Sequence, residues 1–91
     1  QRFIGISGYV PLGNFTYFAA NNGVHGIELW RTDGTAVGTT MVRDLVPGAI
    51  GSNPMGMVRS GDKIFFTATT LGNMSELWIT DGTAEGTRVI K

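Results

Sequence analysis

The chain has 91 residues, contains no Cys, and balances seven basic side chains against seven acidic ones. Without Cys, the chain can form neither a disulfide framework nor a thiolate metal site. The balanced charge argues against nucleic acid or an anionic membrane surface as a partner, and no apolar run approaches the roughly 18–20 residues of a membrane span.

Short apolar and β-branched runs, separated by Gly-rich turns, predict eight short strands. In chain order they are expected at about 6–10, 15–20, 27–32 and 38–45, then at 55–59, 63–70, 75–80 and 87–91. The segment 63–70, KIFFTATT, is the strongest strand signal because it is rich in β-branched and aromatic residues. No window places apolar residues at helical spacing for more than a turn, so we expect almost no helix.

The eight strands form two copies of one unit. The sequence ELWRTDGT at 28–35 returns as ELWITDGT at 76–83, which is 48 residues later. The same shift aligns residues 1–43 with 49–91 without a gap, although the likeness decays over residues 1–7. A repeat of this length indicates a solenoid, propeller or array, in which a single unit cannot bury its own faces.

Four antiparallel strands in each unit match the blade of a β-propeller, whose repeats are roughly 40–50 residues long. The predicted fold is therefore all-β, with one propeller-like blade and its linker at 1–48 and a second blade at 49–91. Two blades alone would expose broad apolar faces, so oligomerisation or further repeats must complete the fold. Three or four chains would supply about six or eight blades, and a contact that does not close would give a filament.

The segments ELWRTDGTAVGT at 28–39 and ELWITDGTAEGT at 76–87 resemble the bacterial ELWxxDGT repeats. DLVPG at 44–48 and GSNP at 51–54 are similar to the linker between units of that family. The resemblance implies propeller-like β-structure in a secreted or surface-attached protein that serves as a structural or interaction module. It transfers no catalytic residue to this chain.

The apolar residues of the repeat are expected to pack between blades. The residues predicted to pack are Phe18, Leu29, Trp30, Phe66, Leu77 and Trp78. Trp30 and Trp78 share a sheet face with Glu28 and Glu76, so a Glu of a neighbouring strand or blade is a plausible partner for each indole N–H. The alternative for the two tryptophans is a platform on which a sugar stacks.

Asp33-Gly34 and Asp81-Gly82 are expected to set tight turns, because a short carboxylate can accept backbone N–H bonds there. A metal site is the alternative. Each turn supplies only one carboxylate, whereas calcium takes about six to eight oxygen ligands. We therefore expect no metal and no cofactor.

The loops at 21–26 and 69–74 differ between the copies, so they are where specificity would lie if the chain binds a ligand. Asn21, Asn22, His25 and Asn73 are the candidate ligand-binding residues, since they offer hydrogen-bonding groups to a sugar or a peptide. His25 is the single His, and its counterpart is Asn73, so the repeat itself does not require it.

The sequence therefore predicts a non-enzymatic, extracellular or cell-surface module whose main partners are copies of itself, forming a ring or a filament. A propeller lectin or adhesin that binds carbohydrate through inter-blade loops is the alternative. A glycosidase would require a clustered acid pair and an arginine cluster, and the arginines are scattered along the chain.

Overall fold

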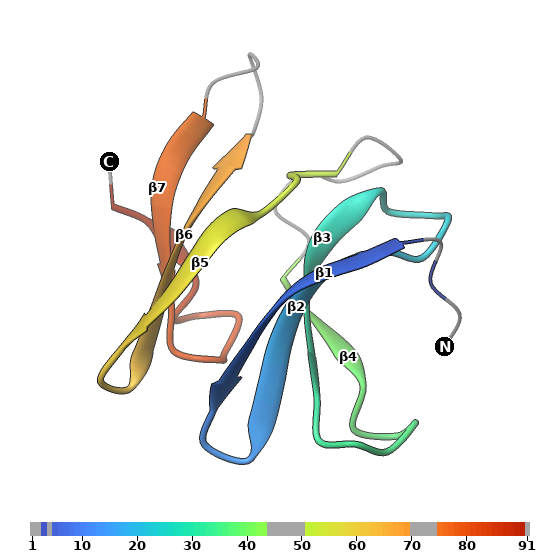
Figure 1. Ribbon diagram of the computed structural model, residues 1–91. Coiled ribbons are helices and arrows are strands. Elements are labelled where there is room, and N and C mark those ends of the chain that lie inside the picture. The colour runs from blue at the N-terminus through green and yellow to red at the C-terminus, as the bar shows by residue number, and fades with distance from the viewer. Residues whose placement is uncertain (1–2, 4, 44–50, 70–74, 91) are drawn as a thin grey trace.

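The computed structural model describes residues 3, 5–43, 51–69 and 75–90, which form two four-stranded antiparallel sheets (Figure 1). The first sheet contains β1 (Gly5–Leu12), β2 (Phe15–Asn21), β3 (Ile27–Thr32) and β4 (Thr40–Arg43). The second contains β5 (Met55–Ser60), β6 (Lys63–Thr69), β7 (Ser75–Thr80) and β8 (Arg88–Val89). The strands of each sheet lie side by side in chain order.

This arrangement confirms the all-β prediction of two four-stranded units, although the two sheets do not close a ring. No described residue lies in a helix, and none of the described elements is a helix that could span a membrane. The fourth strands begin later than expected, at Thr40 in the first sheet and at Arg88 in the second, and the expected strand residues 44, 45 and 91 lie outside the described ranges.

The two sheets repeat the same strand register. Phe18 lies opposite Trp30 in the first sheet, as Phe66 lies opposite Trp78 in the second. The first strand of each sheet has an irregularity at the same place, between Ser7 and Val10 and between Met55 and Val58. The 48-residue repeat in sequence is therefore also a repeat of backbone geometry.

Side chains alternate across a strand, so each sheet has two faces, which we name after the Leu-Trp pair of its motif. The Trp face carries Phe18, Ala20 and Trp30 in the first sheet and Phe66, Ala68 and Trp78 in the second. The Leu face carries Tyr17, Ala19 and Leu29 in the first sheet and Phe65, Thr67 and Leu77 in the second. Both faces of both sheets are thus largely apolar.

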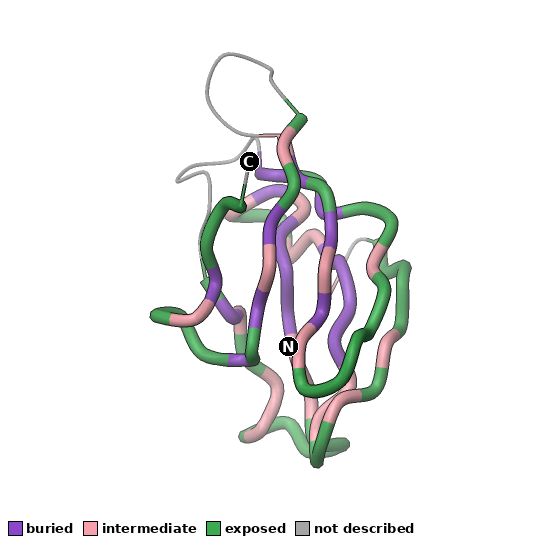
Figure 2. Tube along the Cα trace, turned by 90° about the vertical axis from the view of Figure 1, so that its left-hand side faces the viewer, coloured by how far each residue is buried: buried purple, intermediate pink, exposed green. Residues whose placement is uncertain are grey.

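The main core forms where the Leu face of the first sheet packs against the Trp face of the second. Its buried residues are Tyr17, Leu29, Val42, Ile64, Phe66, Ala68 and Trp78. Figure 2 shows buried segments running along the strands in the interior of the molecule, with exposed turns at their ends. Two unlike faces therefore meet, and one face of each kind is left over.

Residues 51–53 join the two sheets through their backbone. The Ser52 N–H donates to the carbonyl of Ile27 in the first sheet at 2.9 Å, and the Thr69 N–H of the second sheet donates to the Ser52 carbonyl at 2.7 Å. The Ser52 hydroxyl also donates to the Glu28 carboxylate at 2.5 Å. Ser52 and Glu28 are fully buried, and a buried carboxylate needs such donors.

The first sheet's Trp face has its own small core. Phe3 packs edge-on against Phe18 and Trp30, with ring centroids 5.5 Å and 4.9 Å apart. Phe18 and Trp30 are buried beneath it. Trp30 is thus covered by Phe3 and does not lie in the core between the sheets, because neither described sheet packs on that side.

Two expectations about packing change. Leu77 is 39% exposed, whereas its counterpart Leu29 is fully buried, because no sheet of the described structure packs on the second sheet's Leu face. The prediction that a Glu pairs with each indole N–H was wrong: the Nε1 atoms of Trp30 and Trp78 are buried and make no hydrogen bond in the described structure. Glu28 instead accepts from Ser52.

Replacing Trp78 by Ala should lower the free energy of unfolding by about 3–5 kcal/mol, because it opens a cavity in the core between the sheets. Leu77→Ala is the matched control, and it should cost clearly less because much of that side chain is already in water. Urea denaturation at low protein concentration measures both. Equal losses would contradict this account of the core.

Candidate functional site

The loop at 21–26 brings Asn21, Asn22 and His25 together. The Asn22 carboxamide oxygen accepts the N–H groups of Val24 and His25, each at 2.9 Å, and the Asn22 amide nitrogen lies 2.9 Å from His25 Nδ1. The Asn21 oxygen accepts the Gly23 N–H at 2.8 Å. These polar groups already hold the shape of the loop, so fewer of them are available to a ligand. Asn73 lies outside the described residues.

The turns at 33–38 and 81–86 are built alike. The Asp33 carboxylate accepts the N–H and the hydroxyl of Thr35 at 3.0 Å and 2.6 Å, and Asp81 accepts those of Thr83 at 2.9 Å and 2.7 Å. The threonine hydroxyl, followed by its backbone N–H, holds the pKa of each aspartate below its ordinary value. Both carboxylates are thus engaged by groups of their own turn.

A glycine is required close to each of these carboxylates. A Cβ added to Gly38 would collide with the Asp33 carboxylate, and one added to Gly86 would collide with that of Asp81. Gly34 and Gly82 follow the aspartates and have φ angles of 97° and 99°, which only glycine adopts readily. Among the described residues, no group of three His, Asp or Glu side chains could hold a metal ion.

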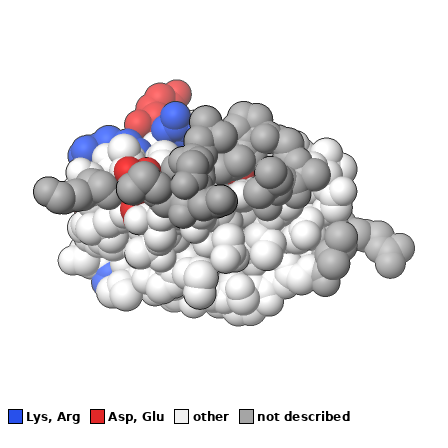
Figure 3. All heavy atoms as spheres, turned by 90° about the horizontal axis from the view of Figure 1, so that it is seen from above, with Lys and Arg blue, Asp and Glu red and all other residues white. Residues whose placement is uncertain are grey.

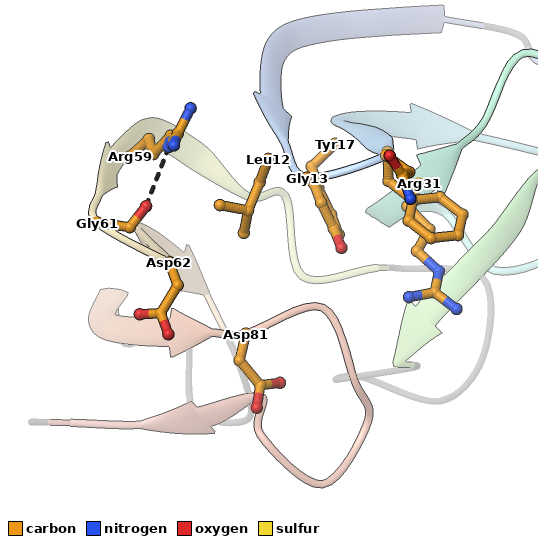
Figure 4. Close-up of a pocket in the computed structure, with 10 residues that line it drawn as sticks. Leu12, Gly13, Tyr17, Arg31, Arg59, Gly61, Asp62 and Asp81 are labelled. Carbon is orange, nitrogen blue, oxygen red and sulfur yellow. Dashed lines mark hydrogen bonds between the residues drawn. The ribbon is translucent and has the colours of Figure 1, made fainter.

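A cleft of about 610 Å³ lies between the hairpin ends of the two sheets (Figure 4). Leu12, Gly13, Tyr17 and Arg31 line it from the first sheet, and Arg59, Gly61, Asp62 and Asp81 line it from the second. Arg59 donates to the Gly61 carbonyl at 3.0 Å, and Asp62 pairs with Lys63 at 3.0 Å. The cleft is open, with charges of both signs at its rim.

At the base of this cleft, polar groups of the first sheet contact the turn of the second. Arg31 lies over the Phe15 ring at 4.1 Å and donates through Nη1 to the Gly82 carbonyl at 2.8 Å. Arg43 donates to the Thr87 carbonyl. A Cβ on Gly82 would collide with the Tyr17 hydroxyl, so the ring of Tyr17 sits directly against this turn.

The two faces outside the core expose apolar side chains. On the Trp face of the first sheet, Ile6 and Tyr9 are 46% and 65% exposed beside a cavity of about 380 Å³. On the Leu face of the second sheet, Met55, Val58, Leu77 and Ile90 are exposed. In the view of Figure 3 the charged side chains gather toward one edge, and much of the remaining surface is uncharged.

Sequence reasoning missed three contributors to these surfaces. Phe3 lies in the segment where the repeat decays, so its counterpart, Gly51, gave no signal for a packing role. Arg31 stands opposite Ile79 in the alignment, and Tyr17 opposite Phe65. The signal that could have identified Arg31 and Tyr17 is that their counterparts in the second copy are different residues. Such a difference marks a position where one copy contacts a neighbouring turn and the other copy does not.

We expect the fold to become less stable as the pH is lowered and the two turn aspartates become protonated. The pKa of each aspartate is lower in the folded chain than its ordinary value of 3.8. The stability that the two carboxylates contribute is therefore complete above pH 3.8 and is lost as the pH drops through the lowered pKa. The double variant Asp33→Asn, Asp81→Asn should therefore show a shallower loss of melting temperature between about pH 5 and about pH 2. An unchanged profile would mean that other carboxyl groups cause the acid sensitivity.

Gly86→Ala should destabilise the fold by about 1–3 kcal/mol, because the new methyl group displaces the Asp81 carboxylate from its turn. Asp81→Ala should then lower the free energy of unfolding less in the Gly86→Ala variant than in the parent chain. A double-mutant cycle by chemical denaturation measures the coupling. Additive effects would show that the two residues act separately.

Comparison of the chain with protein-family models, with curated proteins and with solved structures found no match in any of the three.

Proposed function

We propose that the chain is a non-enzymatic structural module that associates head to tail with copies of itself. The observation that carries this proposal is the contact between unlike faces, the first sheet's Leu face on the second sheet's Trp face. The chain therefore retains an open Leu face on the second sheet and, on the first sheet, a Trp face whose core residues are covered by Phe3 and by no sheet of the described structure. Because a Leu face and a Trp face fit each other within the chain, the same kind of contact can form between the remaining Leu face of one chain and the remaining Trp face of another.

The residues that form the internal contact have close counterparts on the open faces. Tyr17, Leu29 and Val42 on the buried Leu face correspond to Phe65, Leu77 and Ile90 on the open one. Phe66, Ala68 and Trp78 on the buried Trp face correspond to the identical residues Phe18, Ala20 and Trp30. Size and apolar character are kept at each position.

Burial of exposed apolar surface supplies the driving force. Leu77 and Ile90 are 39% and 44% exposed, and they lie beside Met55 and Val58 on one face. Each square ångström of apolar surface that is removed from water contributes about 25 cal/mol. A head-to-tail contact gives a ring if its rotation closes and a filament if it does not, and three or four copies would supply about six or eight blades.

The resemblance to ELWxxDGT repeats supports the same proposal. It rests on the two copies of the motif at 28–39 and 76–87, and it implies an extracellular or cell-surface setting. A structural role also agrees with the turn aspartates, whose carboxylates are bonded within their own turns.

The alternative function is carbohydrate binding, and the cleft between the hairpins favours it. The cleft places charged groups at its rim beside the half-buried Phe15 ring, and ligand sites combine aromatic and polar groups in this way. In this alternative, binding would persist in variants that no longer associate. A glycan array without a binder would count against it.

The native mass should exceed the 9.7 kDa of one chain and should rise with protein concentration. Sedimentation equilibrium across a wide concentration range measures it. A single species of about three or four chains would indicate a closed ring, and a ladder of sizes would indicate a filament. A chain that stays monomeric at all concentrations would contradict the proposed function.

A further inference from the structure

The cavity on the Trp face of the first sheet corresponds to a place on the Trp face of the second sheet that a side chain fills. The cavity is lined by Phe18, Thr32, Gly34, Thr35 and Thr39, and also by Ala36, Phe3, Ile6 and Tyr9. A shift of 48 residues converts the first five into Phe66, Thr80, Gly82, Thr83 and Thr87, with no change of residue type. The part of the wall that these five residues form is therefore the same in both places, whereas Phe3, Ile6 and Tyr9 are replaced by Gly51, Pro54 and Met57.

The backbone and side chains of these walls also have the same geometry. The hydroxyls of Thr32 and Thr39 lie 2.7 Å apart, and so do those of Thr80 and Thr87. In the second sheet, however, Thr80 and Thr87 are fully buried, whereas Thr32 and Thr39 are only half-buried. The difference arises because the first sheet covers this place on the second, whereas no sheet among the described residues covers the corresponding place on the first.

Tyr17 is the side chain that occupies this place on the second sheet. It belongs to the core that contains Phe66, and its hydroxyl lies where a Cβ on Gly82 would be. Phe65 is the counterpart of Tyr17 on the open Leu face, and it differs only by the hydroxyl. The Tyr17 ring, which packs against Phe66 and Gly82, therefore has a close counterpart in the Phe65 ring on the open Leu face of the second sheet.

We propose that Phe65 of a second copy of this chain enters the cavity between Phe18 and Gly34, as Tyr17 does against Phe66 and Gly82 within the chain. This inference rests on the proposed self-association and specifies its register. Leu77 and Ile90 of the second copy then lie over Trp30, where Leu29 and Val42 lie near Trp78 within the chain. The contact buries Tyr9, whose counterpart Met57 packs against the core between the sheets.

Phe3 competes with this contact. It covers Phe18 and Trp30 in the single chain, whereas its counterpart, Gly51, has no side chain and pairs with the backbone of Ile27. A second copy must displace the Phe3 ring to reach Trp30. Arg31 is replaced by Ile79, so the hydrogen bond to the Gly82 carbonyl has no equivalent at Gly34. Both features make the contact between chains weaker than the contact within the chain.

Two charge variants test the register. Phe65→Asp removes the entering ring, and Tyr9→Asp places a carboxylate at the edge of the cavity. Tyr9 is 65% exposed and Phe65 is half-buried on the open Leu face, so circular dichroism at low concentration must first show that both variants fold. Each variant alone should associate at least tenfold more weakly than the parent chain in sedimentation experiments. Val24→Asp, at a loop residue that is 64% exposed, should leave association unchanged.

Mixing the two variants gives the decisive result. The Tyr9→Asp chain keeps an intact Leu face and the Phe65→Asp chain keeps an intact cavity, so a 1:1 mixture should form a dimer and nothing larger. If Phe65→Asp alone blocks association while Tyr9→Asp has no effect, like faces pair with each other and the proposed register is overturned. If the parent chain never associates, the proposed function itself fails.

Phe3→Ala tests the competition. It should lower the concentration at which the parent chain associates, because the second copy no longer displaces a bound ring. Circular dichroism at low concentration confirms that the variant remains folded. Weaker association of a folded Phe3→Ala chain would show that Phe3 belongs to the interface and does not compete with it.

Discussion

The structure depends on one constraint: each sheet is apolar on both faces, so it cannot stand alone in water. A sheet with one polar face can lie at the surface of a fold, whereas a sheet with two apolar faces is stabilised by a neighbour on each side. The Leu face of the first sheet and the Trp face of the second satisfy this need for each other. The other two faces remain, and Phe3 covers part of one of them.

The contact between the sheets is specific because polar groups set its register. Arg31 and Arg43 bind backbone carbonyls of the facing turn, and Ser52 bonds to both sheets at the other end. Hydrogen bonds of this kind add modestly to stability, but a misplaced sheet would leave the buried Glu28 carboxylate without the Ser52 hydroxyl. Apolar burial drives the packing, and these bonds select one arrangement of it.

The Asp-Gly turns show why conspicuous residues need not form a ligand site. Each aspartate accepts two hydrogen bonds from the threonine two residues later, and a glycine leaves room for its carboxylate. Both the acid and the glycines are explained by the turn itself. In the proposed function, association uses instead the two faces that no sheet of the described structure covers.

The amino-acid sequence by itself determined the strands, the repeat and the turn chemistry, because these depend on local preference and on a comparison of the chain with itself. The strand at 63–69, the 48-residue spacing and the Thr-Asp-Gly-Thr turns all appear as expected in the structure. Only the tertiary structure decided which faces meet. Identical motifs cannot show that Leu29 is buried while Leu77 is exposed, or that Phe3 covers Trp30, because burial depends on which neighbour is present in space.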